Sequence, residues 1–257
     1  MDHFLQPMKN LRYLEELFVA DIIDIVYRLS DNGYPKEKFK FATKEFCLLN
    51  ILQYTYHPLR FNILVDTTNL KSETKDMVER YAKKYDFAHR LHYVTAGSSA
   101  GSWRVAWNFA MANCKQRVYF VEDDYLHRED YGVALQQGLE IAEYVSLYDH
   151  NDKYIPASKG GNQFIDEDGG EVTKVFRTAS AHWKLTNSTT MTFATDMKTL
   201  KEDEEIWKKW TLETHPHDFQ AFLELREKGR SLVTPIPGYS THCEPKWATP
   251  GIDWSQI

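Results

Sequence analysis

The chain has 257 residues, of which 42% are hydrophobic and 14% aromatic, enough for one large core. It carries 31 basic and 37 acidic residues, a net charge of −6, which argues against a nucleic-acid backbone as main partner because that would favour a basic surface. Three cysteines without a CxxC spacing argue against a disulfide scaffold or a cysteine-rich zinc site.

Nothing in the sequence predicts a membrane span or a secretory signal. Met1 to Leu11 lack the apolar core of a signal peptide, and no apolar run approaches about 18 residues. An odd number of cysteines fits reduced thiols. We therefore expect a cytoplasmic protein.

Short apolar runs alternate with helical patterns through the first half of the chain. Strands are predicted for residues 21–27, 61–66, 91–94 and 118–121, and helices for 43–54, 73–84, the segment after 97–101, and 131–147. This alternation is typical of βαβ units, so we predict an α/β fold with a mostly parallel central sheet. The entirely apolar run 118–121 is expected at the centre of that sheet.

The alternation ends after Asp149. Glycine pairs and Thr- and Val-rich stretches up to about Thr195 predict loops and antiparallel hairpins. Helices are predicted for 202–210 and for a last segment with Pro216 in its first turn and Gly229 at its end. Residues 235–257, rich in Pro, Gly and Trp, predict an ordered loop.

Three acids, Glu122, Asp123 and Asp124, directly follow the fourth predicted strand. In open parallel sheets, ligands bind beyond the carboxyl ends of the strands. Adjacent carboxylates repel one another unless a cation or polar ligand satisfies them. Oxygen ligands suit a hard divalent ion, Mg²⁺ or Mn²⁺, that can bridge to a diphosphate. A solvated turn or a helix cap is the alternative, and the triplet alone leaves both open.

The order of motifs resembles that of the GT-A glycosyltransferases. Residues 118–124 resemble their apolar strand followed by a DxD signature, in its Glu-Asp-Asp variant, and residues 97–108 look like the loop and helix upstream of it. Residues 215–219 and 237–243 are similar to segments of small GT-A transferases from chlorella viruses and related bacterial sequences. The likeness spans roughly residues 20–254. It implies one GT-A domain over 1–257, with a nucleotide-sugar half at about 20–125 and an acceptor half at about 126–257.

The resemblance also implies a nucleotide-diphosphate sugar donor, UDP- or GDP-linked, and Mn²⁺ or Mg²⁺ as cofactor. Asp124 would coordinate the metal together with His242, since a neutral imidazole is a competent ligand, although a lone histidine is more often structural. Glu122 and Asp123 would contact the ribose or the donor sugar. Further donor contacts are expected at Tyr27, Arg28, Asp66, Ser98 and Arg104. For the two arginines, ordinary surface positions are the alternative.

For the chemistry, the resemblance favours inversion, in which one carboxylate takes the proton of the acceptor hydroxyl as its oxygen attacks the anomeric carbon. Asp218 is the predicted general base. An acid there also suits a helix N-terminus, and Glu213 and Asp196 remain alternatives. The acceptor would be a glycan or glycoconjugate. Its predicted contacts are Trp183, Ser188 and Thr189, with core packing the alternative for Trp183.

Two other functions remain open. A sugar-phosphate nucleotidyltransferase also uses an α/β sheet and acidic metal ligands, but residues 27–34 offer only Gly33 and Arg28 where a Gly-rich, basic loop is expected. A non-catalytic sugar- or nucleotide-binding module is the other. The motifs GxxxxGK[ST], GxGxxG after the first strand, HExxH and GxSxG are absent, which argues against a P-loop kinase, a dinucleotide oxidoreductase, a zincin and an α/β-hydrolase.

Overall fold

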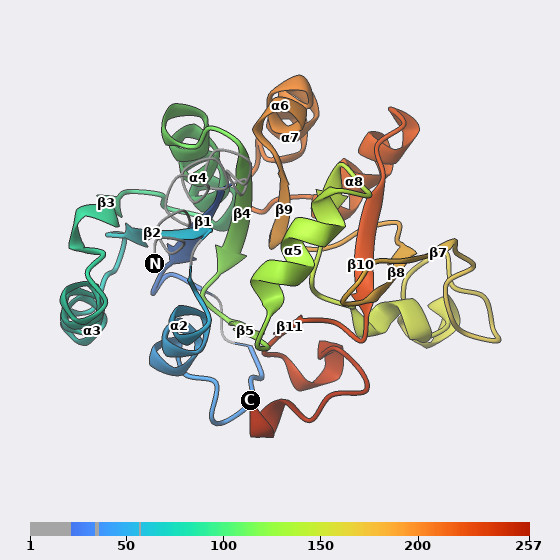
Figure 1. Ribbon diagram of the computed structural model, residues 1–257, viewed down its shortest axis with the longest axis horizontal. Coiled ribbons are helices and arrows are strands. Elements are labelled where there is room, and N and C mark those ends of the chain that lie inside the picture. The colour runs from blue at the N-terminus through green and yellow to red at the C-terminus, as the bar shows by residue number, and fades with distance from the viewer. Residues whose placement is uncertain (1–21, 34–35, 57) are drawn as a thin grey trace, which may run out of the picture.

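A computed structural model describes residues 22–33, 36–56 and 58–257, so Met1 to Leu11 and the predicted strand start at Asp21 lie outside the described residues. Within them a nine-stranded sheet has the order β3-β2-β1-β4-β9-β6-β10-β8-β7 (Figure 1). Its strands are β1 Ile23–Leu29, β2 Leu59–Asp66, β3 Leu91–Val94, β4 Arg117–Glu122, β6 Tyr144–Val145, β7 Val175–Arg177, β8 His182–Leu185, β9 Phe193–Asp196 and β10 Leu232–Ile236. A two-stranded sheet pairs β5 (Tyr125–His127) with β11 (Ser240–His242).

The N-terminal half of the sheet, β3-β2-β1-β4, is parallel. Every residue of β1 is buried, as expected for a strand covered on both faces. The C-terminal half adds antiparallel pairs of β9 with β4 and β6, and the hairpin β7–β8. The predicted α/β fold class is confirmed.

Helices cover both faces of the sheet (Figure 1). One face carries α2 (Lys44–Gln53), α3 (Ser72–Lys84) and α5 (Tyr131–Leu139). The other carries α4 (Ser99–Asn113), α6 (Met197–Glu202), α7 (Glu204–Trp210) and α8 (Asp218–Glu227). Short 3₁₀ helices lie at Ala88–Arg90, Asn151–Tyr154, Ala157–Lys159, Pro245–Trp247 and Trp254–Gln256. None of the helices in the described part of the chain is both long and apolar enough to cross a bilayer, and the cytoplasmic location stays a prediction.

Four predicted elements differ from the structure. The helix predicted over 131–147 ends at Leu139, because Tyr144 and Val145 form β6 and pair with β9 and β10. The helix predicted over 202–210 is divided in the structure, since Glu202 ends α6 and Glu204–Trp210 form α7. Pro216 precedes α8 instead of lying in its first turn, and the predicted loop 235–257 contains the end of β10 and all of β11.

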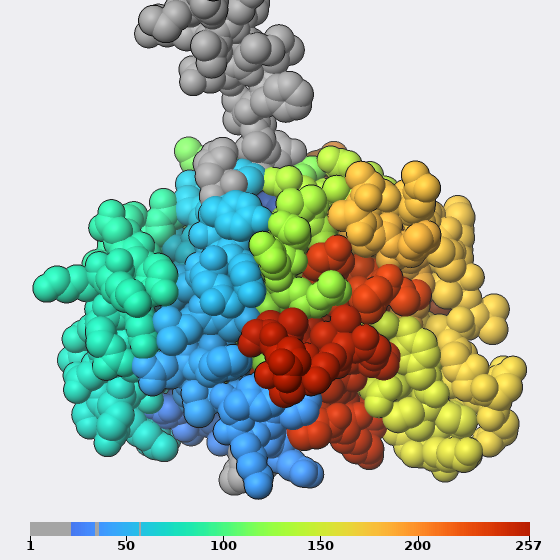
Figure 2. All heavy atoms as spheres, turned by 60° about the horizontal axis from the view of Figure 1, so that its bottom comes forward, coloured from blue at the N-terminus to red at the C-terminus, as the bar shows by residue number. Residues whose placement is uncertain are grey.

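A third apolar cluster joins the chain's C-terminal segment to α2. Cys47 and Cys243 are buried there as free thiols, with their Sγ atoms 3.8 Å apart, and Trp254 packs nearby. The backbone N–H of Phe39 donates to the carbonyl of Cys243 (2.9 Å). Figure 2 shows the C-terminal segment, in red, between the blue segment leading into α2 and the yellow-green segment around residues 150–165. This packing fixes β11 beside β5.

Gly138 allows α5 to approach the sheet closely. A Cβ at this position would lie 2.8 Å from both Trp183 Cη2 and Val145 Cγ1, inside the core. Gly138→Ala is therefore expected to lower the free energy of unfolding by about 1–3 kcal/mol through overpacking. Denaturant unfolding measures it, with Val133→Ala on the exposed side of α5 as control, expected within about 0.5 kcal/mol of wild type. Equal stability of the two variants would contradict this packing.

Candidate functional site

A cavity of about 380 Å³ lies where β1 and β4 end. Its walls come from the loop after β1, the start of α4, the loop before α8, and the three acids at the end of β4, Glu122 to Asp124. We call Glu122, Asp123 and Asp124 the acidic tip. The carboxyl ends of parallel strands are the usual ligand-binding edge of an open α/β sheet. The cavity is therefore the candidate functional site.

Each carboxylate of the acidic tip has a cationic partner. Glu122 Oε1 lies 3.3 Å from Arg28 Nη2. Asp123 Oδ2 accepts hydrogen bonds from Lys44 Nζ and from the backbone N–H of Ser30. Asp124 Oδ2 lies 3.0 Å from Lys38 Nζ and 3.2 Å from His242 Nε2. These cations offset the repulsion among three adjacent carboxylates.

Strand pairing brings His242 to Asp124. β5 follows the acidic tip directly, and its Tyr125 lies opposite His242 in the antiparallel pair with β11. The backbone N–H of Cys243 also donates to the carbonyl of Asp124 (2.9 Å). Glu244 Oε1 lies 3.7 Å from His242 Nδ1, so a carboxylate faces the other side of the imidazole. The two predicted metal ligands are thus adjacent on a fixed backbone.

Asp124 stays ionised although it is only 7% exposed. Burial would raise its pKa, but the hydrogen bond and charge of His242 and the charges of Lys38 and Lys36 hold the pKa well below its ordinary value. A carboxylate with an imidazole is a donor set that fits Mn²⁺ or Mg²⁺ when phosphate oxygens and water complete the coordination. Within the described ranges no cluster of three or more His, Cys, Asp or Glu side chains is arranged to hold a metal. The pairing of Asp124 with His242 as metal ligands stays a prediction.

Four of the residues predicted to bind the donor line this cavity: Arg28, Ser98, Glu122 and Asp123. Arg28 is nearly buried, and its Nη2 donates to the carbonyl of Met191 (3.1 Å), which holds it beside Glu122. Ser98 caps α4 by accepting from the N–H of Gly101 (2.9 Å).

Three others are placed differently. Tyr27 is completely buried and packs on Phe61, so it offers no surface to a donor. Asp66 is buried and accepts from the backbone N–H groups of Thr68 and Ala96, which fixes the loops beside the cavity. Arg104 donates to the carbonyls of Thr211 and Glu213. These contacts make Tyr27, Asp66 and Arg104 supports of the site, away from its lining.

Asp218 is the first residue of α8, three positions after His215, which lines the cavity. Its carboxylate accepts from the N–H of Phe219 (2.7 Å). Burial raises the pKa of Asp218 to about 7, and the negative charge of Glu122 adds to this rise. The hydrogen bond from the N–H of Phe219 and the charges of Lys153 and His217 lower the pKa and offset part of the rise. Asp218 is thus a carboxyl with a pKa near neutrality that does not itself line the cavity, and its role as general base stays a prediction.

The alternative bases lie in less suitable places. Asp196 pairs with Arg117 at the start of β4, the opposite end of that strand from the acidic tip. The side chain of Glu213 is 76% exposed and pairs with His217.

The predicted acceptor residues are mostly inaccessible. Trp183 is completely buried and its indole N–H donates to Thr178, so stacking on a sugar is excluded in this conformation. Ser188 and Thr189 are each 6% exposed. Ser188 accepts from the buried Lys153 (2.8 Å), whose pKa burial lowers, and Thr189 bonds Ser146 (2.7 Å). The hydroxyls of Ser188 and Thr189 are therefore engaged by other buried side chains.

Sequence reasoning missed three lysines that line the cavity: Lys36, Lys38 and Lys44. A signal was present, because Lys36 and Lys38 are two positions apart and an extended segment points such residues to the same side.

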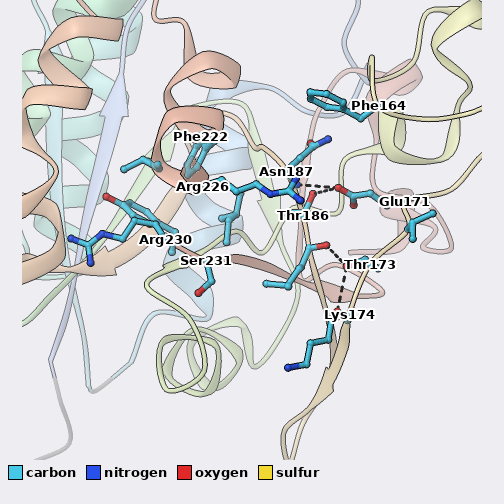
Figure 3. A pocket seen from close by; sticks show the side chains of 15 residues that line it. Phe164, Glu171, Thr173, Lys174, Thr186, Asn187, Phe222, Arg226, Arg230 and Ser231 are labelled. Carbon is cyan, nitrogen blue, oxygen red and sulfur yellow. Dashed lines mark hydrogen bonds between the residues drawn. The ribbon is translucent and has the colours of Figure 1, made fainter. Parts of the chain in front are cut away.

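A second cavity, of about 540 Å³, lies between α8 and the strands β8 and β10 (Figure 3). Phe222 and Arg226 of α8 face Lys174 and Glu171 across it. Phe164 on its wall stacks on Phe219, the neighbour of Asp218, with ring centroids 6.1 Å apart. None of the predicted site residues lines it.

Comparison with known proteins gives no match to a family model and no match among curated proteins. Solved structures do match. A 4-diphosphocytidyl-2C-methyl-D-erythritol synthase from Anaerococcus prevotii is 13% identical with a TM-score of 0.50, over 84% of this chain and 87% of that one.

GalNAc-T7, in a structure with UDP, GalNAc and Mn²⁺, is 11% identical with a TM-score of 0.59 over 91% of this chain, which spans only 45% of that protein. The galactosyltransferase LgtC, in complex with donor and acceptor sugar analogues, is 14% identical over 78% of this chain and 69% of that one, with a TM-score of 0.43. At such identities the likeness concerns the fold alone. The chain has the GT-A type of α/β fold that its sequence predicts.

Proposed function

We propose that this chain is a divalent-metal-dependent glycosyltransferase, moving a sugar from a nucleotide-diphosphate donor to an acceptor hydroxyl. The observation that carries the proposal is that Asp124, which lines a cavity at the ligand-binding edge of the sheet, has an oxygen 3.2 Å from Nε2 of His242. The fold shared with GalNAc-T7, a structure that holds UDP and Mn²⁺, supports it.

Asp124 and His242 would hold Mn²⁺ or Mg²⁺, which when bound supplies positive charge to the diphosphate leaving group. The donor, UDP- or GDP-linked, would lie in the 380 Å³ cavity. Asp123 and Glu122, held in place by Lys44 and Arg28, would accept hydrogen bonds from hydroxyls of the ribose or the sugar. Ser98 and the start of α4 line the same cavity.

Asp218 would act as the base of an inverting transfer. The acceptor oxygen forms a bond to the anomeric carbon as the bond from that carbon to the diphosphate oxygen breaks, and Asp218 takes the acceptor's proton. The nucleoside diphosphate leaves with the bonding electrons. The acceptor, a glycan or glycoconjugate, would have to bring its hydroxyl to Asp218 at the start of α8.

Ligand-induced stabilisation tests the proposal. UDP or GDP at about 100 times its dissociation constant with Mn²⁺ is expected to add about 2.7 kcal/mol, or roughly 5–10 °C in melting temperature, because it binds only the folded state. The gain should disappear in excess EDTA. Stabilisation by UDP that ignores Mn²⁺, with no turnover of UDP- or GDP-sugars, would instead support a non-catalytic nucleotide-binding module.

A second candidate, a sugar-phosphate nucleotidyltransferase, gains support from the basic segment after β1. Lys36, Lys38 and Lys44 add positive charge at the cavity to that of Arg28, the one basic residue of 27–34. The fold shared with the diphosphocytidyl synthase adds to it. Product analysis separates the two: release of pyrophosphate from a nucleoside triphosphate and a sugar phosphate indicates the nucleotidyltransferase, and release of a nucleoside diphosphate from a sugar nucleotide indicates the glycosyltransferase.

A further inference from the structure

Two lysines meet at the carboxylate assigned to the metal. Lys38 Nζ lies 3.0 Å and Lys36 Nζ 3.8 Å from Asp124 Oδ2. Lys36 Nζ also lies 3.3 Å from Glu244 Oε1 and 3.5 Å from His242 Nε2. Both lysines line the 380 Å³ cavity. In this state two ammonium groups surround the oxygen that a divalent cation would need.

The lysines and their partner differ in freedom of movement. Asp124 is buried, and the strand pair β5–β11 fixes its backbone. The side chains of Lys36 and Lys38 are 21% and 31% exposed and end on flexible four-carbon stems. A cation arriving at Asp124 repels both ammonium groups, so the lysines must turn away while Asp124 stays in place.

Among the described residues that line the cavity, the only carboxylates near these lysines are those of the acidic tip, and Lys36 also has Glu244 beside it. The lining includes four cations, Arg28, Lys36, Lys38 and Lys44, against the three carboxylates of the acidic tip. Lys44 is already bound to Asp123 and the carbonyl of Ser30, and Arg28 to Glu122 and the carbonyl of Met191. When Asp124 takes a metal, Lys38 and Lys36 are thus the lining cations that lose their contact with that carboxylate, while Lys36 keeps Glu244 beside it. A diphosphate, with two to three negative charges, matches them as a point-charge ligand.

We propose that Lys36 and Lys38 are ligands of the donor's diphosphate, kept on Asp124 until a divalent cation takes that carboxylate. The inference rests on the proposed function and deepens it. The two lysines would bind the diphosphate from the side of the segment before α2, and Asp124 would compete with the diphosphate for them. Metal binding and diphosphate binding are then coupled through this competition.

The test uses inorganic pyrophosphate as probe, with binding measured by calorimetry in EDTA at low salt. In metal-free protein the double variant Lys36→Gln/Lys38→Gln is expected to bind pyrophosphate at least about tenfold more weakly than wild type, because two charge-assisted contacts are lost. Lys40→Gln is the matched control: it lies in the same segment, is exposed, and should bind within about twofold of wild type. Thermal unfolding of each variant checks its folding.

Asp124→Asn supplies an effect of opposite sign. Removing the competing carboxylate should tighten metal-free pyrophosphate binding about five- to tenfold. Removing the repulsion between Asp124 and phosphate would also tighten pyrophosphate binding, so the effect of Asp124→Asn is measured again in the Lys36→Gln/Lys38→Gln variant. If the lysines bind the diphosphate, most of the increase in affinity should be lost in that variant. If wild-type binding in EDTA is too weak to measure, the comparison of the Asp124→Asn single and triple variants decides.

Equal pyrophosphate binding by wild type and the double lysine variant, or a gain from Asp124→Asn that persists without the lysines, would overturn the assignment. Binding of UDP with Mn²⁺, measured on wild type in parallel, tests the proposed function separately. If UDP does not bind with Mn²⁺, the proposed glycosyltransferase function is contradicted. If UDP binds with Mn²⁺ but the lysine variants bind pyrophosphate as wild type does, only the assignment of the lysines is contradicted.

Discussion

Asp124→Asn should lower sugar transfer by about 1,000-fold and remove the dependence of donor binding on Mn²⁺. The side chain keeps its shape, but it loses the negative charge that a divalent cation requires, and a loss of about 4 kcal/mol in transition-state stabilisation corresponds to this factor. His242 alone remains as a ligand, and its imidazole carries no negative charge to replace the carboxylate. Release of nucleoside diphosphate from a sugar nucleotide measures the transfer, and calorimetry measures Mn²⁺ binding.

The matched control is Asp196→Asn. Asp196 is also an aspartate in an ion pair next to β4, but it pairs with Arg117 where that strand starts, away from the cavity. Its amide variant should keep activity within about twofold. Full activity of Asp124→Asn, or of wild type in excess EDTA, would remove the metal from the mechanism.

The acidic tip could be predicted from the sequence because its signal is local. An apolar run followed at once by three acids marks the end of a buried strand, and β4 ends at Glu122. His242 has no such signal. It reaches Asp124 through the pairing of β5 with β11, a contact between distant parts of the chain that only the likeness to a known family suggested.

The errors have tertiary causes. Residues 140–147 continue an apolar pattern that suits a helix, but Tyr144 and Val145 gain more by completing the sheet between β9 and β10. The sequence left two positions possible for Trp183, in the core or in an acceptor cleft. Its indole packs in the core because Gly138 leaves space for it there. Lys36 and Lys38 were missed because their long side chains reach the cavity from a segment with no regular secondary structure, and Lys44 because it reaches the cavity from the first residue of α2.

Asp218→Asn is expected to lower kcat/KM by about 10²- to 10⁴-fold while UDP still binds with Mn²⁺, because the amide cannot accept the acceptor's proton. In wild type, kcat/KM should rise about tenfold per pH unit below 7 and level off above it, since burial raises the pKa of Asp218 to about 7 and only the ionised form is a base. Glu213→Gln, which removes the exposed alternative carboxylate, serves as control and should keep both the rate and the profile.

The same pKa makes a stability prediction of known sign. The pKa of Asp218 is raised by burial from about 3.8 to about 7, so the folded state binds the proton more tightly than the unfolded state. Its ionisation therefore costs stability as pH rises from about 4 to about 7, and the cost is constant above that. The free energy of unfolding of Asp218→Asn, minus that of wild type, should therefore be about 1–2 kcal/mol more favourable to the variant at pH 8 than at pH 4. This figure allows for partial exposure of the side chain. Unfolding by denaturant at the two pH values measures the difference. A relative gain of the opposite sign would mean that Asp218 is ionised and paired in the folded state, and a carboxylate so satisfied would be a poor base.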